Sequence, residues 1–477
     1  HFTQSNRWLD NELEHLDLQL ELFPIINIPS VEAIEISEDD NSRYKVLGDA
    51  RAPQTMEFET LFQKCKKREP VPDSEFRGID MEKFLFYTCL QGYIPKMNTQ
   101  YTHSSLTTQA TFIPQVEKNV IMKEVFLCCG ATYLAWNNVQ RFQNMSDELY
   151  VNCKLMIRNY IRQNENTAQE DWLFTALQLL CNRDKNSLTG TADDAAWHLI
   201  RAYDIIRTRY CGSRTKLSEF TIIDKLVNSN LTLQPQERTL IESFIYQYSV
   251  SLFFVQDTKG LPSPFTIFKV LNAVLKCPVR NCESLADWMS NPILGSSLDS
   301  FEILAKLSFI GRMSKPVSKE WLDRVARLRS MCEYYTPAAP SKPMGDNHWQ
   351  NFKINSMAGV VTAKACWLFA SKLLYFDLFD IQDQSVQECV DDILMCCKKI
   401  PVGHNVWGIL PWVLLVTGAF VVDQDQQAIV LDYVELWSER AHSYNSFKIA
   451  AFLRKAWASG NAPDFLFERS QLLSVSM

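Results

Sequence analysis

The chain has 477 residues, with 48 Lys and Arg against 55 Asp and Glu, for a formal net charge of −7. That charge gives no general attraction to phosphate, so this polypeptide by itself is a poor nucleic-acid binder. Glycine accounts for only 15 residues, while 12% of the residues are aromatic. Because nucleotide-binding sheets and β-barrels depend on glycine at turns with positive φ, the shortage favours long helices joined by few turns.

The stretch 1–78 is the least regular part of the sequence, and we expect an irregular N-terminal arm or linker there. The chain opens with His1 instead of an initiator Met, so we also expect a natural segment upstream. From residue 79 onward, apolar residues recur at helical spacing. The segment Val120–Trp136 is apolar around most of its circumference, which predicts a helix surrounded by other helices.

Two helix-start signals predict an antiparallel helical hairpin over residues 172–206. Thr167-x-x-Glu170 has the spacing of a capping box, and Thr191-x-x-Asp194 resembles a second N-cap. Between the two helices, the polar segment Asn182–Gly190 predicts a loop.

The rest of the chain also follows a helical period, with one clear break. Residues 335–352 contain three prolines, so we expect a proline-rich loop between a first helical part, 79–334, and a C-terminal helical part, 353–477. The fold class predicted is all-α, a single large domain of antiparallel helices. The further helices expected lie near 235–256, 263–276, 297–313, 318–333, 357–377, 384–398, 405–422, 425–440 and 445–458.

The longest uncharged apolar run, Val406–Val422, is 17 residues long and contains Pro411. Its length is at the lower limit for a membrane span, and we expect a buried core helix and no membrane partner. The 14 cysteines lie mostly in apolar helical stretches. They are therefore predicted to be small core residues with free thiols, in a reducing compartment.

The sequence lacks the motifs that catalytic and metal sites usually need. No two histidines are three or four residues apart, and neither a phosphate-binding loop nor a nucleophile elbow is present. An all-α enzyme of the terpene synthase type would need a DDxxD cluster to bind magnesium, but Asp391-Asp392 and Asp193-Asp194 both lack the third acid. We expect no catalytic residue, no metal and no cofactor in this chain, with such an enzyme as the least favoured alternative.

Six segments occur in a familiar order along the chain. They are FLFYTCLQGYIPKM at 84–97, VIMKEVFLCCGATYLAW at 120–136, WLFTALQLLCNRDKNSLTGTADDAAWHLIRAYDII at 172–206, NPILGSSLDSFEILAKLSFIGRM at 291–313, ILPWVLLVTGAFVVDQDQQ at 409–427 and FKIAAFLRKAW at 447–457. This order resembles the regulatory domain of the fungal-specific transcription factor family, whose members bind DNA through a zinc binuclear cluster. The resemblance covers roughly residues 81 to 460.

The resemblance implies transcriptional control of metabolic genes in the nucleus. It also implies a DNA-binding module with six closely spaced cysteines and a basic stretch, which nothing in this chain matches. We therefore expect zinc and DNA to be bound by a module upstream of His1. The net charge of −7 fits that division, because DNA affinity would lie in a separate basic module.

Aromatic residues are concentrated after the proline-rich stretch, and two interpretations of them remain open. Either they line a cavity between helices that binds a small-molecule effector, or they fill the core, with glycines that allow close helix packing. The candidate effector-binding residues are Trp367, Phe369, Trp407, Trp412, Gly418 and Phe420. A third hypothesis is a ligand-free scaffold that forms a homodimer or binds a co-regulator protein through the helix at 445–458.

Overall fold

The chain forms helices and connecting loops wherever its structure is described. The computed structural model describes residues 53–67, 71–136, 139–211, 231–256, 258, 260–282, 287–339, 346–473 and 475. It separates into two units, His1–Gln63 and Lys64–Met477, and all packing described below lies within the second. Among the described residues, β-pairing is limited to one bridge between Leu233 and Val279. The predicted all-α fold is confirmed.

The first helices of the second unit pack around one helix that is apolar on nearly all sides. These helices are α3 (Met81–Thr88), α4 (Ile94–Lys96), α5 (Thr108–Phe112), α6 (Val120–Ala135) and α7 (Val139–Gln163). Thirteen of the sixteen residues of α6 are buried, and it contacts α3, α7 and α8 (Asp171–Asn186). The side chain of Asn119 starts α6 by accepting a hydrogen bond from the N–H of Ile121 at 2.9 Å.

A proline lies inside the first helical run. A π-helical turn, Cys89–Tyr93, joins α3 to α4, and Pro95 follows it. Proline has no N–H, and its ring crowds the preceding turn of an ordinary helix, so the wider turn accommodates it. The chain thereby continues as a helix as far as Lys96.

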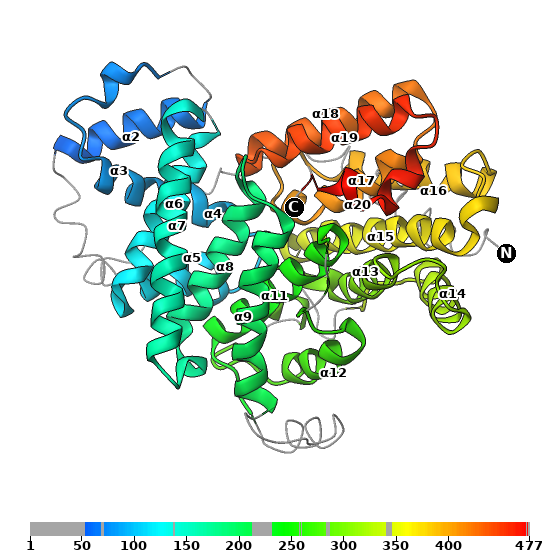
Figure 1. Ribbon diagram of the computed structural model, residues 1–477, viewed down its shortest axis with the longest axis horizontal. Helices are drawn as coiled ribbons and strands as arrows, with labels where there is room; N and C mark the ends of the chain where they lie inside the picture. Colours follow the sequence, from blue (N-terminus) through cyan, green and yellow to red (C-terminus); the bar gives the residue numbers. More distant parts are fainter. Residues whose placement is uncertain are drawn as a thin grey trace. The chain divides into compact units, whose positions relative to one another are not determined.

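The middle of the unit is built around α11. The helices here are α8, α9 (Ala192–Cys211), α11 (Pro235–Phe254), α12 (Pro264–Leu275), α13 (Leu298–Gly311) and α14 (Lys319–Glu333). Sixteen of the twenty residues of α11 are buried, because it is covered by α5, α8, α9 and α13 (Figure 1). The predicted hairpin is present as α8 and α9, and its second N-cap is confirmed: Asp194 N–H donates to Thr191 Oγ1 at 3.1 Å.

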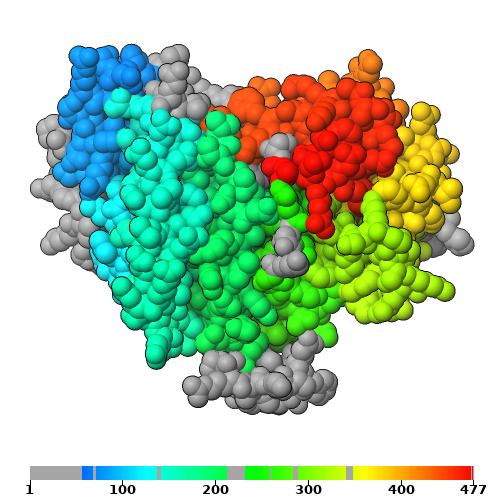
Figure 2. Space-filling view, viewed as in Figure 1, coloured from blue at the N-terminus to red at the C-terminus, as the bar shows by residue number. Residues whose placement is uncertain are grey.

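The C-terminal helices surround α15. They are α15 (Asp346–Tyr375), α16 (Gln384–Lys399), α17 (Pro411–Phe420), α18 (Gln424–Ala441), α19 (Asn445–Ala458) and α20 (Arg469–Leu472). The segment His348–Leu378 is long and apolar enough to cross a membrane, but 89% of its apolar window is buried inside the protein, as in a core helix. All of α17 is buried as well. Figure 2 shows the C-terminal segment (red) against α13 and α14 (yellow-green), where Arg312 donates to the Leu466 carbonyl at 2.6 Å.

Several boundaries differ from the sequence prediction. The capping box predicted at Thr167 is wrong: α8 starts at Asp171, and Glu170 instead accepts a hydrogen bond from the indole N–H of Trp172 at 2.8 Å. The helix predicted over 405–422 is divided, because a 3₁₀ turn precedes Pro411, whose missing N–H is harmless at a helix start.

Two stretches expected to be irregular contain helix. The helix α15 begins inside the predicted loop 335–352, and α2 (Pro53–Lys66) lies inside the predicted arm 1–78. Most of that arm, up to residue 52, lies outside the described residues. In both places hydrophobic spacing was a weak guide, because polar residues separate the apolar ones.

Candidate functional site

The six candidate effector-binding residues are all buried, and two of them contact the same aromatic ring. Phe369 belongs to α15 and Trp412 to α17, and the ring of Phe253 on α11 lies between them, with centroid distances of 5.3 Å and 5.7 Å. Phe369 also stacks on Phe467 at 4.8 Å. These four rings, Phe253, Phe369, Trp412 and Phe467, are called the aromatic cluster below. The cluster joins parts of the chain that lie far apart in sequence.

Trp412 differs from the other rings of the aromatic cluster in its indole N–H. The side chain is 1% exposed, and Nε1 has no hydrogen-bond partner among the described residues. A buried donor without a partner costs about 1–3 kcal/mol. A bound molecule with an acceptor at this point would remove that cost, whereas plain core packing leaves it in place.

Trp367 and Trp407 lie outside the aromatic cluster. The guanidinium of Arg329 covers the ring of Trp367, 4.5 Å from its centroid. Trp407 lies in the turn before α17, and its indole N–H donates to the Pro401 carbonyl at 3.1 Å. Both rings therefore have protein partners that account for their positions.

Gly418 and Phe420 support the packing interpretation at the far end of α17. A Cβ at Gly418 would lie 2.8 Å from Leu453 Cδ1 and 3.1 Å from Val430 Cγ1, so glycine permits close approach of α18 and α19. The ring of Phe420 meets Phe379 at 5.6 Å. The structure thus brings only Phe369 and Trp412 into one candidate site.

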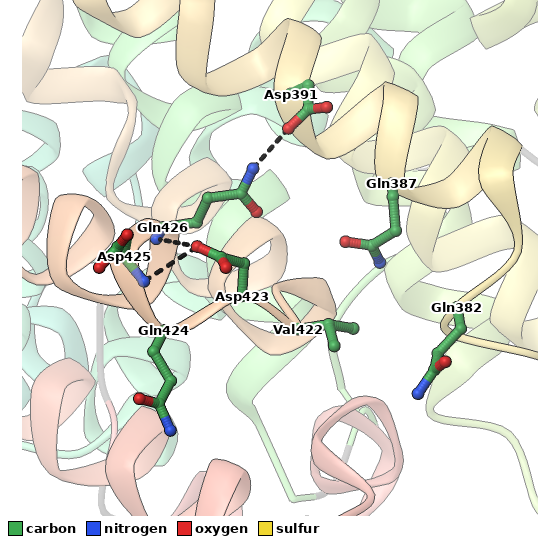
Figure 3. A pocket seen from close by; sticks show the side chains of 8 residues that line it. All are labelled: Gln382, Gln387, Asp391, Val422, Asp423, Gln424, Asp425 and Gln426. Carbon is green, nitrogen blue, oxygen red and sulfur yellow. Dashed lines mark hydrogen bonds between the residues drawn. The ribbon is translucent and has the colours of Figure 1, made fainter.

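A surface pocket of about 710 Å³ lies between α16 and the start of α18 (Figure 3). Asp423 caps α18 by accepting from the N–H groups of Asp425 and Gln426, and the Gln426 amide donates to Asp391. None of the six predicted residues lines this pocket. It is lined by Gln382, Gln387, Asp391, Val422, Asp423, Gln424, Asp425 and Gln426. Because Asp391 and Asp423 already accept hydrogen bonds from the protein, their position has a structural explanation.

Sequence reasoning missed a polar network where α7, α8 and α9 meet. Asp184 is fully buried at its centre and accepts from Tyr150 Oη at 2.6 Å and from Arg183 Nη1 at 3.2 Å. His198 Nε2 lies 3.2 Å from the same carboxylate. Arg183 also pairs with Asp147. We call these five residues the hairpin network, and within it the buried arginine lies between two carboxylates.

The loop of the hairpin is held from both sides. A Cβ at Gly190 would lie 2.0 Å from the carbonyl oxygen of Asp184, so only glycine fits against the end of α8. Lys448 on α19 donates to the carbonyls of Ser187 and Gly190, each at 3.2 Å. The sequence predicts a loop over Asn182–Gly190, but α8 continues to Asn186. One signal for this was present: the charged triplet that begins at Arg183 continues the helical period of the apolar residues before it.

A second buried carboxylate, Glu242 on α11, holds the turn that precedes α13. It accepts from the N–H groups of Leu294 at 2.8 Å and Ile293 at 3.2 Å. Burial raises the pKa of Glu242 to about 7, against the opposing effect of Arg238 and these backbone hydrogen bonds. The residue therefore caps two backbone N–H groups that are buried in this turn.

Metal binding has no support in the part of the chain that the structure describes. No group of three or more His, Cys, Asp or Glu side chains there could hold a metal ion. The 14 cysteines are free thiols, all of them buried except Cys211 and Cys277, which are half-buried. The described residues therefore do not fit a zinc cluster.

A model of the fungal specific transcription factor domain matches residues 91–462, more than three quarters of the chain. The chain belongs to this family. The match takes in α8 and α9 with their buried network and also α17 with Trp412. This fungal specific transcription factor domain has a role in regulating transcription, and its family is not an enzyme class. No DNA-binding module is detected in the chain, and no curated protein or solved structure matches it.

Proposed function

We propose that this chain is the effector-responsive regulatory domain of a sequence-specific fungal transcription factor that controls metabolic genes. The single observation that carries the effector part is the aromatic cluster, where rings from three helices surround a tryptophan whose indole N–H has no partner among the described residues. A molecule that accepts this hydrogen bond would bind best when α11, α15 and α17 are arranged around it. Differential affinity for that arrangement is what lets a ligand shift a conformational equilibrium.

The surroundings of Trp412 define the chemistry of the proposed effector. Phe253 and Phe369 offer only aromatic surface, so most of the ligand would be apolar. We expect an apolar molecule with one or two hydrogen-bonding groups, which suits a sterol or an apolar amino acid better than a sugar.

The test is a thermal-shift and calorimetry screen of the full chain against amino acids, pathway intermediates and sterols. Trp412→Phe keeps an aromatic ring but removes the N–H together with the five-membered ring of the indole. We expect it to weaken binding of the effector at least about tenfold, the value of one hydrogen bond of about 1.4 kcal/mol. Trp407→Phe is the matched control. It removes an indole N–H whose acceptor is the protein itself, and the ligand response should survive.

Two results would overturn the effector proposal. One is that no compound binds the chain in either assay. The other is that the same compound binds wild type and Trp412→Phe equally well, which would mean that the indole N–H does not meet the ligand.

A second candidate function, self-association or co-regulator binding through α19, is favoured by one residue. Phe447 is 59% exposed and stacks on Trp136 at 5.3 Å. Aromatic side chains, phenylalanine included, are enriched at protein interfaces relative to the rest of the surface. Light scattering decides between the states: a dimer that dissociates in Phe447→Ser supports this function, and a monomer at micromolar concentration rules out self-association.

The remaining parts of the proposal concern DNA, zinc and location. We propose that the chain acts on DNA only through a separate zinc-binding module, and that it works in the nucleus, as membership in the family suggests. A fluorescent fusion of the full-length protein should enter the nucleus under at least one growth condition. Exclusion from the nucleus under all conditions would contradict this part.

A further inference from the structure

Three cationic side chains approach one another where α4 meets the end of α18. They are Lys96 at the end of α4, Arg440 in the last turn of α18, and Lys66 at the end of α2. Among the described residues, none of the three forms an ion pair with a carboxylate. No acidic group is among the causes that shift the pKa of Lys96 or of Arg440. We call these three residues the basic cluster.

Arg440 has a structural role that its hydrogen bonds explain. It donates to the carbonyl of His404 at 2.7 Å, to Asn405 Oδ1 at 2.6 Å and to the carbonyl of Asn98 at 3.4 Å. All three acceptors are neutral, and none of these hydrogen bonds is an ion pair. Burial and the charge of Arg440 lower the pKa of His404 to about 4, and the neutral imidazole accepts the N–H of Val406 at its Nδ1.

Lys96 lacks even neutral acceptors. It is half-buried, and its ammonium group makes no hydrogen bond with the residues that the structure describes. Burial, then Arg440, then Lys66 lower the pKa of Lys96 to about 7. Lys448 offers a useful contrast, since it is also half-buried but has two carbonyl acceptors. No described side chain or carbonyl therefore uses the charge of Lys96.

We propose that the basic cluster is a binding site for a small oxyanion ligand, a metabolite with a phosphate or carboxylate group. An oxyanion between Lys96 and Arg440 would supply both the missing negative charge and acceptors for the ammonium group. The site is independent of the aromatic cluster and of the effector proposed there.

The location gives such a site a regulatory consequence. Arg440 already links α18 to the backbone at Asn98, across 342 positions of sequence. A ligand held by Lys96 and Arg440 would strengthen this link between the two ends of the domain. Its binding would therefore stabilise the contact between Arg440 and the segment that follows α4, and raise the melting temperature.

The experiment titrates the full chain with inorganic phosphate and, separately, with citrate, at constant ionic strength set by potassium chloride. We expect calorimetric binding and a higher melting temperature with at least one of the two, and at least a tenfold weaker affinity in Lys96→Gln. A response to phosphate alone identifies a phosphorylated ligand, and a response to citrate alone identifies a carboxylate. Lys448→Gln is the matched control and should bind the anion as wild type does.

A second readout separates binding at Lys96 from a merely structural effect. At pH 8 the side-chain amine of Lys96, which lies near Arg440 and Lys66, is largely deprotonated. An anion bound beside it would raise the pKa of Lys96, so that the amine takes up a proton. Calorimetry in two buffers with different ionisation enthalpies should show proton uptake in wild type and none in Lys96→Gln. Absence of anion binding, or equal binding and proton uptake in wild type and Lys96→Gln, would overturn the proposal.

Discussion

The hairpin network contains a buried cation and the basic cluster contains two half-buried ones, and the partners of these charges differ. In the hairpin network, Arg183 lies between Asp147 and Asp184, and its charge is matched within the protein. In the basic cluster, Lys96 forms no ion pair with a described carboxylate, and the hydrogen bonds of Arg440 go to neutral acceptors. A buried cation paired with carboxylates of the same chain links the helices that carry them. A cation without such a pair is a candidate for binding an anionic ligand.

The largest effect is expected where the matched charges are disturbed. Asp184→Asn removes the charge at the centre of the hairpin network and leaves Arg183 and His198 with a neutral neighbour in a fully buried position. Breaking a buried ion pair of this kind costs about 3 kcal/mol in unfolding free energy. Urea unfolding measures it, with Asp204→Asn as the control.

Asp204 is a fair control because it lies on α9 but is exposed and forms only ion pairs with Arg201 and Arg207, three residues away on the same helix. Surface ion pairs of this kind contribute about 0–1 kcal/mol to the free energy of unfolding. Equal losses in the two variants would show that the buried network does not differ from ordinary surface pairs, and the comparison would fail.

A smaller loss is expected when the hairpin loop is disturbed without changing any charge. Gly190→Ala would place a Cβ 2.0 Å from the backbone oxygen of Asp184, which cannot move without distorting α8. We expect a loss of about 2 kcal/mol by urea unfolding. At Gly408 the nearest atom is a side-chain methyl, Thr99 Cγ2 at 3.0 Å, so Gly408→Ala should cost less. The reverse order would contradict this account of the loop.

The smallest effect, and one of opposite sign, is expected in the basic cluster. The folded state lowers the pKa of Lys96 from 10.5 to about 7. Between these values the unfolded chain binds more protons, so the stability of wild type rises with pH above 7. In an anion-free buffer, Lys96→Gln should be more stable by about 1 kcal/mol at pH 6.5, after allowance for solvent screening, with the difference shrinking toward pH 9.

The same urea titrations at several pH values test this prediction. Burial also lowers the pKa of Lys448, to about 8, but its ammonium group donates to two carbonyls. Lys448→Gln is therefore the control, and it should gain less stability than Lys96→Gln at pH 6.5. A Lys96→Gln variant that is less stable than wild type at pH 6.5 would mean that the charge of Lys96 is matched within the protein.

The helices could be predicted from sequence because their apolar residues recur at a regular spacing. The buried helix at 120–136 and the N-cap at Thr191 were found in this way, and the order of segments indicated the family. Where hydrophobic spacing was weak, as at the start of α15, the boundary was missed. The capping box at Thr167 failed because Glu170 binds the Trp172 indole instead of the backbone.

The candidate sites were harder to predict, because they depend on contacts between distant segments. Composition singled out the aromatic residues, but only the fold shows that Phe253 joins Phe369 to Trp412. The basic cluster has no sequence signal at all. Lys96 and Arg440 are more than 300 positions apart, and neither stands in a basic run.

The most direct test of the regulatory role is a reporter assay with the full chain fused to a heterologous DNA-binding module. The account predicts that the fusion changes transcription of the reporter relative to the module alone, and that the change depends on nutrient supply. It also predicts that Trp412→Phe removes the nutrient dependence. Reporter output equal to that of the module alone under every nutrient condition would contradict the central claim.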